Sequence, residues 1–567
     1  MNTDADNRQS TARLGVARLA KSRQGRTSGE AWVNHQQYER IRVYPCLSVV
    51  IFLFFIAVAH LSGTNTPPAR TNAAFSCIMH VHTRMSSGKY QLPELTRIAR
   101  DQGVDVIFLS DNLVESIEFG FLPLRHIFWA GYQEKPSILT IGWKRCLAEV
   151  QRENERLSRA SHGQSRATRD KSSATMRNAW QARDKPDVLY IPGVEVVPRF
   201  FWSGSLLKTN LVCHNHQRNL VILGTQNTRS LVNLPITCGY MPGRDTLWII
   251  ITRVLLVLFI SACLGFLFLP RRMARRSGYS AGMIRRAFLF GLILPLVLLM
   301  IVVNLTASWM PAFDIYSPDN PERFEQRVLD ALKREKLISF WAHPEAPDHQ
   351  EFKYFGVSFA VDTRPYPEVL LKTKGYTGFA GVNQGANKFV NPGSIWDVVL
   401  KQYLDGKRDE PPWCFGEMLY HYEGQSGKSL SNVETMVWAP EKKAAALLDS
   451  IRKGLFYARW NYAGQSFTLD QWQVNGFESG QTGRTTNSSV NISLRVSAKI
   501  PGEKAEVLII RNGEVIKKAD MILPLELNLQ DSLPRAARGP SEPRVYYRAV
   551  VSGKYPVRLV TNPIFIR

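Results

Sequence analysis

Histidine side chains that could bind a metal ion are the first candidates for chemistry in this chain of 567 residues. His80 and His82 are separated by one residue, and side chains two positions apart lie on the same face of an extended strand. Neutral imidazoles are common ligands of divalent transition metals, so the pair could bind one ion. The alternative is two ordinary strand histidines, because this spacing alone is weak evidence.

Other polar residues stand directly after apolar runs that are typical of buried strands. Asp111 follows residues 104–109, and His343 follows residues 337–342. In parallel α/β proteins the carboxyl ends of strands gather at one face, where the functional site lies. We therefore expect these side chains to meet near His80 and His82.

Glu195 is the best carboxylate candidate in the chain. It lies in Gly193-Val194-Glu195-Val196, and burying a carboxylate without a cation costs several kcal/mol. We expect Glu195 to bind a metal ion, with a salt bridge to an arginine as the alternative. Farther along the chain, His421 is a further imidazole that could join the site.

Three apolar segments are each close to the roughly 20 residues that span a bilayer. They are residues 43–61, 247–269 and 287–310, and we expect a transmembrane helix in each. Two crossings return the chain to the side that it left. The candidate ligands before and after the second and third segments can therefore form one site.

Basic residues predict the orientation, because Lys and Arg are retained on the cytoplasmic side of a membrane. Residues 1–42 hold eight basic and four acidic side chains, and residues 270–286 hold six arginines and no acid. We expect both stretches in the cytoplasm and both large segments on the outer, periplasmic side of a bacterial inner membrane. Much of the net charge of +23 thus reflects topology, and nucleic acid is not an expected partner.

Local patterns outline the elements that must position these residues. A strand at 73–83, a helix at 92–103 and a strand at 104–109 predict a parallel unit with a crossover, and the polar stretch 151–187 predicts a surface insertion. Further strands are expected at 188–197, 220–224 and 337–342, and further helices at 321–336 and 440–453.

The last hundred residues alternate between apolar and polar positions, and Asn512-Gly513 is a strong hairpin signal. We expect a separate antiparallel β-sandwich there. The predicted organisation is a disordered cytoplasmic tail (1–42), a transmembrane helix (43–61), a first barrel part (62–246), a helix (247–269), a basic cytoplasmic loop (270–286), a helix (287–310), a second barrel part (311–464) and the C-terminal β module (465–567).

The order of these motifs resembles the PHP family, named for polymerase and histidinol phosphatase, and its membrane-associated and carbaryl-hydrolase-like branches. The matching motifs are His80-Val81-His82, Ser110-Asp111, Gly193-Val194-Glu195-Val196, Ala342-His343-Pro344 and a later His421, within roughly 73–224 and 322–460. The resemblance implies an α/β fold, a distorted (β/α)7 barrel, here split by the transmembrane hairpin. It also implies phosphoester hydrolysis with up to three divalent ions, two of them bridged by Glu195.

Four positions depart from the family pattern in residue type. Ser87 and Leu419 stand where relatives have Asp, and Asn112 and Asn219 stand where relatives have His. Serine, leucine and neutral amides bind such ions poorly, so we expect one or two ions of Mn, Zn or Fe, or none. Glu417 could supply a missing oxygen ligand.

The resemblance assigns roles to the remaining residues. His80, His82, Glu195 and His343 would bind metal, Asp111 would orient one ligand without touching the ion, and His421 would be a ligand or a proton donor. Five side chains after the glutamate motif could line the mouth of the barrel: Arg199, Trp202, Lys208, His214 and His216. Arg and Lys there would suit an anionic substrate, and simple exposure at the surface is the alternative.

Two functions follow from this pattern. The first is a membrane-anchored, metal-dependent phosphoesterase that acts on a phosphorylated lipid or an envelope precursor. The second is an inactive relative that keeps the fold to bind a ligand or an envelope partner. Metal content and metal-dependent hydrolysis distinguish the two.

Overall fold

The computed structural model describes residues 72–121, 124–125, 127, 129–169, 187–225, 227–236, 244–308, 315–316, 321–354, 357–385, 387–533 and 545–567. The expected tail (1–42) and the first expected transmembrane segment (43–61) lie outside these residues.

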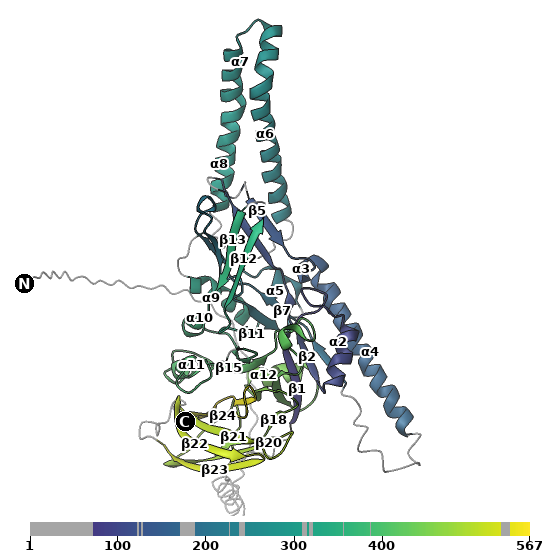
Figure 1. Ribbon diagram of the computed structural model, residues 1–567, viewed down its shortest axis with the longest axis vertical. Coiled ribbons are helices and arrows are strands. Elements are labelled where there is room, and N and C mark those ends of the chain that lie inside the picture. The colour runs from purple at the N-terminus through teal and green to yellow at the C-terminus, as the bar shows by residue number, and fades with distance from the viewer. Residues whose placement is uncertain are drawn as a thin grey trace, which may run out of the picture. The chain divides into compact units, whose positions relative to one another are not determined.

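The first part of the chain forms the predicted parallel unit (Figure 1). Strand β1 (Ala73–Val81) pairs in parallel with β2 (Val106–Leu109), and helix α2 (Leu92–Asp101) connects them. Leu92, Leu95 and Ala99 of α2 are buried, because they share one face of the helix. Strand β6 (Leu189–Ile191) extends this sheet beyond β2.

A second sheet has six strands in the order β15, β14, β11, β10, β7, β3. Their bounds are Trp413–Glu417, Gly378–Asn383, Ile338–Trp341, Leu220–Leu223, Gly193–Val196 and Asp111–Asn112. Strand β10 runs antiparallel to both β7 and β11, which differs from the parallel order that a (β/α) repeat implies. The chain between β7 and β10 forms two short strands and no crossover helix, so it returns in the opposite direction.

The two sheets meet on both sides. The expected strand at 188–197 is divided at Pro192 into β6 and β7, and the chain passes there from the first sheet to the second, because proline removes a backbone donor. On the other side, the segment after β15 bonds to the end of β1, with Tyr420 N donating to His80 O at 2.9 Å and His82 N donating to Tyr420 O at 2.9 Å.

The hairpin of apolar helices is inserted between two neighbouring strands. Strands β10 and β11 pair with Leu220 opposite Trp341 and Leu223 opposite Ile338, although more than a hundred residues separate them. The intervening helices are α5 (Thr228–Val232), α6 (Arg244–Ser277), α7 (Ala281–Phe288), a π-helical turn η2 (Leu289–Ile293), α8 (Leu294–Ser308) and α9 (Pro321–Arg334). The two halves of the expected site are therefore joined by direct strand pairing.

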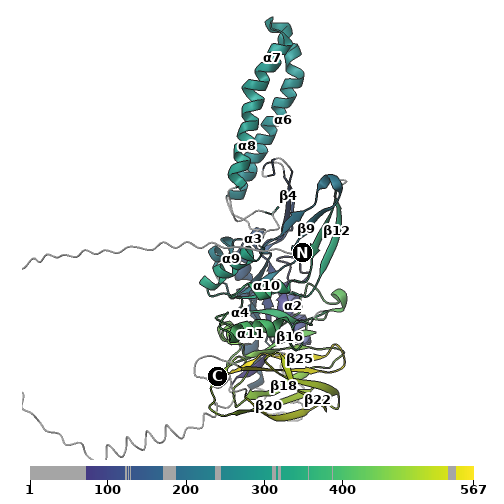
Figure 2. The same ribbon diagram turned by 90° about the vertical axis from the view of Figure 1, so that its left-hand side faces the viewer.

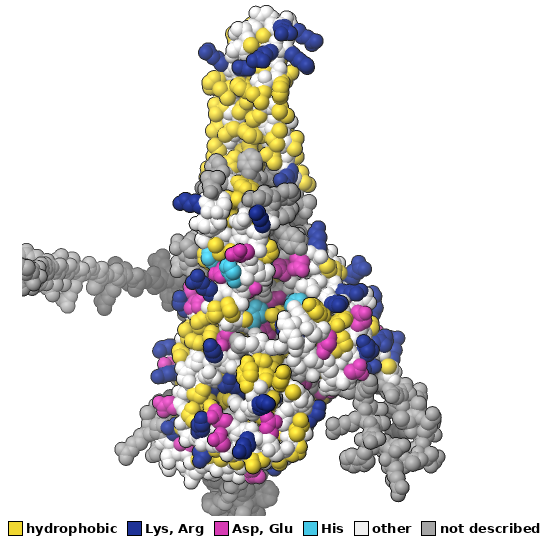
Figure 3. All heavy atoms as spheres, viewed as in Figure 1, with side chains coloured by type: hydrophobic (Ala, Val, Ile, Leu, Met, Phe, Trp, Pro, Cys, Tyr) yellow, Lys and Arg dark blue, Asp and Glu magenta, His cyan; other side chains and the backbone are white. Residues whose placement is uncertain are grey.

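Two stretches of the hairpin, 250–276 and 281–305, are long and apolar enough to cross a membrane. Figure 3 shows an apolar band over them, with Lys and Arg side chains at the tip. The expected loop at 270–286 is instead helical except for residues 278–280, and Pro270 lies inside α6. Arginine favours helix, and apolar helices tolerate proline, so the basic stretch prolongs both helices.

A four-stranded sheet, β12-β13-β9-β8, comes from two excursions of the chain (Figure 2). Its strands are β8 (Phe201–Ser203), β9 (Leu211–His214), β12 (Asp348–Tyr354) and β13 (Val357–Thr363), with the short helix η1 (Leu206–Lys208) between β8 and β9. A separate hairpin is formed by β4 (Ser116–Gly120) and β5 (Trp129–Gln133). Residues 151–169 of the expected polar insertion belong to the long helix α4 (Trp143–Arg169), which α3 (Ile138–Ile141) precedes, and residues 170–186 lie outside the described part of the chain.

The remaining elements before the C-terminal strands flank the two sheets. They are α10 (Pro367–Lys372), α11 (Ile395–Leu404), η3 (Gln425–Gly427), β16 (Val433–Ala439), α12 (Ala444–Arg452) and β17 (Phe456–Trp460). Strand β16 lies between β1 and β17 and is antiparallel to both, so it continues the first sheet toward the C-terminal strands.

The C-terminal strands divide between the large sheet and a sheet of their own. Strand β25 (Arg558–Thr561) pairs with β17, so the large sheet continues through β24 (Val545–Ser552) and β26 (Ile564–Ile566) to β19 (Thr482–Gly483), and through β21 (Lys504–Arg511) to β22 (Glu514–Ile522). Asn512 and Gly513 form the predicted hairpin turn with positive φ. A three-stranded sheet of β18 (Phe467–Val474), β20 (Ser489–Ala498) and β23 (Leu525–Ser532) shares an apolar core with these strands.

Candidate metal centre

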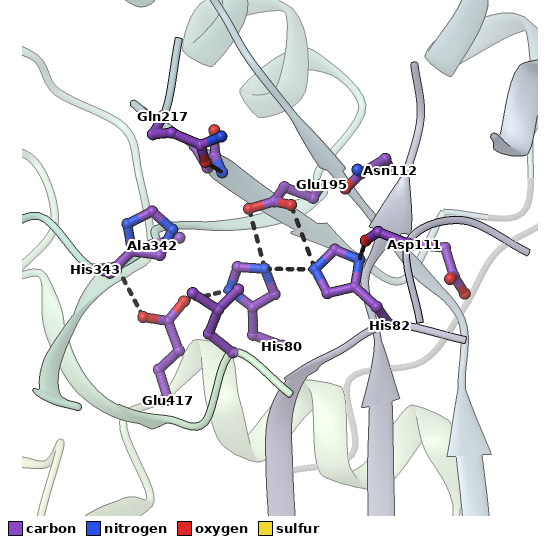
Figure 4. A network of polar contacts seen from close by, with 12 residues as sticks. His80, His82, Asp111, Asn112, Glu195, Gln217, Ala342, His343 and Glu417 are labelled. Carbon is purple, nitrogen blue, oxygen red and sulfur yellow. Dashed lines mark hydrogen bonds and ion pairs between the residues drawn. The ribbon is translucent and has the colours of Figure 1, made fainter. Parts of the chain in front are cut away.

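His80 and His82 come together through a bulge (Figure 4). His80 has φ of 64°, the pairing of β1 with β2 shifts register between Ile78 and Val81, and β1 ends before His82. Simple alternation along a strand, which the sequence suggested, is therefore not what places them. The Nε2 atoms of the two rings are 3.1 Å apart, and both side chains are buried.

Glu195, on β7, faces both rings. Its Oε1 lies 3.0 Å from His80 Nε2, and its Oε2 lies 3.4 Å from His82 Nε2. His343 Nε2 is buried without a hydrogen-bond partner among the described residues. The ligand atoms of His80, Glu195 and His343 lie within 4.8 Å of one another.

Glu417 holds the back of this group. One carboxylate oxygen accepts a hydrogen bond from His80 Nδ1, and the other accepts one from the backbone N–H of His343 at 2.7 Å. A metal-binding histidine commonly donates its second ring N–H to a carboxylate, which aims the other nitrogen at the ion. Glu417 therefore orients His80 and His343 from the end of β15, and it does not take the place of the missing aspartate of the motif at Leu419.

Asp111 acts on His82 through Ser86. Asp111 accepts hydrogen bonds from Thr83 N at 2.7 Å and from Ser86 Oγ at 2.7 Å, and Ser86 Oγ lies 3.2 Å from His82 Nδ1. Because the serine proton points to Asp111, Ser86 can accept the Nδ1 proton of His82, and Ser87 Oγ lies 3.3 Å from the same nitrogen. The Nε2 lone pair of His82 is then directed toward Glu195 and His80.

His421 lies beside His82 and is less deeply placed. The two rings stack with centroids 4.4 Å apart and an angle of 4° between their planes. His421 Nδ1 is buried without a hydrogen-bond partner among the described residues. Burial and the nearby His80 lower the pKa of His421 to about 4, so its ring is neutral at pH 7.

The charges in the group are strongly coupled. Burial alone would lower the pKa of His80, but Glu195 and Glu417 outweigh it and raise the pKa to about 10. Burial and the neighbouring His421 and His80 lower the pKa of His82. His80 lowers the pKa of both Glu195 and Glu417, although burial alone would raise it. The two carboxylates thus face one cationic ring, His80, and neutral imidazoles. The buried group carries excess negative charge that a cation would offset.

A cavity of about 430 Å³ opens on the group and is lined by Glu195, His343 and His421. The four positions that depart from the family pattern line it as well: Ser87, Asn112, Asn219 and Leu419. The side-chain oxygens of Asn112 and Asn219 are buried without a hydrogen-bond partner among the described residues. These four positions therefore line the same cavity as Glu195 and His343.

The donor set fits a divalent ion. With metal–nitrogen bonds of about 2.0–2.1 Å and tetrahedral angles, two ligating nitrogens are roughly 3.3 Å apart, close to the separation of the His80 and His82 nitrogens. The nitrogen and carboxylate oxygens that converge here suit Zn, Mn or Fe. His80, Glu195 and His343 would hold one ion, and His82 would be a further ligand of that ion or, with the second oxygen of Glu195, a ligand of another.

The sequence pointed to most of this group, named Glu417 only as a possible oxygen ligand, and missed the contribution of Ser86. Ser86 belongs to the Ser86-Ser87-Gly88 motif, where a Cβ on Gly88 would lie 2.2 Å from His82 O, so the chain passes tightly around the histidine. Glu417 ends an apolar run, the same signal that identified His343. Of the residues expected to suit an anion, Trp202 and His216 line a neighbouring apolar cavity, and Arg199 is buried over the Phe324 ring.

No family model and no curated protein matches the chain. The chain is similar to a two-domain protein of Bacteroides vulgatus with a predicted PHP-like metal-dependent phosphoesterase (8% identity, TM-score 0.28, covering 88% of this chain and 89% of that one). It is also similar to a candidate metal-dependent phosphoesterase of Bifidobacterium adolescentis (10%, TM-score 0.22, 62% and 90%). A CARDB domain of Pyrococcus furiosus with two metal ions covers 19% of the chain (12%, TM-score 0.13, 96% of that domain). Solved structures similar to the chain thus include PHP-like phosphoesterases, while the function proposed below rests on side-chain geometry.

Proposed function

We propose that the protein is a membrane-anchored, metal-dependent phosphoester hydrolase of the PHP type. The observation that carries this proposal is the convergence of His80, Glu195 and His343 on one point, with Glu417 bonded to the far side of His80. His343 presents a buried nitrogen, Nε2, without a hydrogen-bond partner among the described residues. An ion bound there satisfies this atom and offsets the buried negative charge.

In this proposal the chain's own residues divide the work. Glu417 and the Ser86–Asp111 pair fix the tautomers of His80 and His82, so that the Nε2 atom of each ring faces Glu195. A divalent ion at this point would polarise a phosphoryl oxygen and favour attack by water. His421, stacked on His82 and neutral at pH 7, is placed to accept a proton from that water or to serve as a further ligand.

Metal analysis and hydrolysis of a chromogenic phosphate ester test the proposal. The detergent-purified protein should hold one or two Mn, Zn or Fe ions per chain and release the chromophore only with metal. His80→Ala and His343→Ala should lose both properties. His349→Ala is the matched control, since that histidine is exposed and pairs with Asp362. Full metal content and activity in His80→Ala would refute the proposed site.

The second candidate is a protein that keeps the fold without catalysis. The observation in its favour is that the four departures from the family pattern line the cavity, where they remove ligands for additional ions. An inactive protein would bind no stoichiometric metal and hydrolyse no phosphate ester under any added ion. Bound metal together with activity excludes it.

The proposed location is a bacterial inner membrane, with the sheets on the periplasmic side. Two apolar helices and the arginines around residues 278–280 support it. Single cysteines at exposed positions can test the orientation in intact cells. Ser280→Cys should react with a membrane-impermeant maleimide only after lysis, and Tyr555→Cys should react before it. The reverse order would refute the orientation.

A further inference from the structure

A second cavity, of about 750 Å³, lies beside the candidate metal centre and has a different lining. Its walls come from the β4–β5 hairpin and from the four-stranded sheet, whose elements lie together in Figures 1 and 2. The wall is chiefly apolar, with Phe119, Trp202, Leu211, Phe352, Phe359 and Val361. Its volume falls in the range of about 300–1,000 Å³ that is typical of ligand sites.

The two cavities are continuous in their lining. Glu115, Gln217, Asp348 and Gln350 line both, so one molecule can occupy the metal cavity with a polar end and the second cavity with an apolar end. Burial and Glu134 raise the pKa of Glu115 to about 9, so this carboxyl holds a proton at pH 7; Asp348 is a second carboxyl at the junction, and Glu134 lines the apolar cavity.

The apolar cavity also contacts the chain that joins the membrane hairpin. Trp202 N donates to Ile315 O at 2.6 Å, and the ring of Phe119 packs edge-on to Tyr316 with centroids 6.0 Å apart. In the connection between β4 and β5, Ile127 packs into one apolar cluster with Leu255 of α6 and Met300 of α8.

Aromatic rings form the rim and the interior. Phe119 and Trp202 meet edge to face at 5.3 Å, Trp202 meets Phe359 at 5.8 Å, and Phe352 stacks on Phe359 at 5.2 Å. Phe121 and Phe352 are 40% and 42% exposed, so the rim of the cavity presents aromatic surface to the outside.

From these contacts we infer that the apolar cavity holds the hydrocarbon chain of a membrane-lipid phosphoester whose phosphate lies at the metal centre. The inference rests on the proposed function for the phosphate end. In the reaction, water forms a bond to phosphorus, the bond from phosphorus to the alcohol oxygen breaks, and the long-chain alcohol leaves with a proton. The alcohol chain remains in the apolar cavity until it returns to the bilayer.

Binding of n-alkylphosphonates with two, four, six and eight carbons to the full chain in lipid nanodiscs tests the inference without hydrolysis. Calorimetric affinity, corrected for partition into empty nanodiscs, should rise roughly threefold for each added methylene, as expected for burial in an apolar site. Two variants should make the affinity independent of chain length. Val361→Trp fills the cavity, and Phe352→Asp makes its rim polar and is safer for folding. Val515→Trp, at an exposed position of β22, is the matched control and should keep the dependence on chain length.

The outcomes separate the inference from the proposed function. Affinity that does not depend on chain length in the wild-type protein overturns the inference, even if short phosphate esters are hydrolysed. A dependence that persists in both cavity variants also overturns it. A dependence that is lost in both variants supports the apolar cavity, and it does so even if metal and hydrolysis are absent and the proposed catalysis fails.

Discussion

Metal binding at His80 should release one proton, and the apparent affinity should therefore depend steeply on pH. In the metal-free protein, Glu195 and Glu417 keep His80 protonated, with a pKa of about 10. A metal ion needs the Nε2 lone pair, so it must displace the proton on that nitrogen while Glu417 retains the proton on Nδ1. The perturbation is a change of pH during a titration with Zn²⁺ or Mn²⁺.

The size of the effect follows from the pKa. The pKa of His80 lies about three pH units above pH 7. Competition with the proton therefore lowers the apparent affinity for metal at pH 7 roughly a thousandfold below its high-pH limit. Between pH 6.5 and 8.5 the affinity should rise about a hundredfold, tenfold for each unit. His82 and His343 add nothing in this range, because burial lowers the pKa of both. Asp111, with a pKa that burial raises to about 6, is mostly ionised there.

Calorimetric titration of the metal-stripped protein measures both quantities. Repeating the titration at pH 7 in two buffers of different ionisation enthalpy gives the number of protons released, which should be close to one per ion. His349→Ala should behave like the wild-type protein. Release of no proton at pH 7, or an affinity that changes less than threefold from pH 6.5 to 8.5, would refute the assignment of His80 Nε2 as a ligand.

Three further perturbations test the surrounding structure. Glu417→Gln should weaken metal binding about 10- to 100-fold with the fold intact, because Glu417 orients His80, and unchanged affinity in the same titration would contradict this role. The melting temperature of Glu115→Gln should exceed that of the wild-type protein by a margin that grows as pH rises from 5 to 9. The reason is that the folded wild-type protein keeps the Glu115 proton while the unfolded chain loses it, which destabilises the folded state. A margin that does not change with pH would exclude the raised pKa. Arg548→Ala should lower the free energy of unfolding by about 3–5 kcal/mol, because it leaves Asp397 buried and unpaired between β24 and α11. The control Arg495→Ala, at an exposed position, should lower it little. Equal shifts in melting temperature would count against a stabilising role of the Arg548–Asp397 pair.

The predicted elements agree with the structure where local pattern decides them. The helix at 92–103 and the strands around it are recovered because period and capping are local properties, and α2 begins after a Gln91 capping box. The hairpin at Asn512-Gly513 is recovered for the same reason, since the turn requires positive φ at both residues.

Chain direction and sheet membership were not predictable in this way. Strand β10 looks like any buried strand, and only its partners show that it runs antiparallel. The C-terminal strands likewise look like a separate module, but β25 completes its hydrogen bonds on β17. Both properties depend on pairings between residues far apart in the sequence, which a local pattern does not contain.

The candidate site shows the same division between local and distant information. The sequence gives the residue types of His80, Glu195 and His343, and their places after apolar runs indicate a shared edge. It does not give the positive φ that turns His80 out of register, nor the contact by which Glu417 reaches it from β15. These features depend on the backbone of β1 being held from both sides, by β2 and by the segment after β15.

The insertion of the apolar hairpin between β10 and β11 links catalysis and membrane in the proposed enzyme. Because the two strands pair directly, the hairpin can anchor the protein without separating His343 from Glu195. The same insertion brings Ile315 and Tyr316 into contact with Trp202 and Phe119, which line the apolar cavity. A soluble relative would need neither contact. Mutations that uncouple Tyr316 from Phe119 should therefore impair use of long-chain phosphoesters in a bilayer while leaving metal content unchanged.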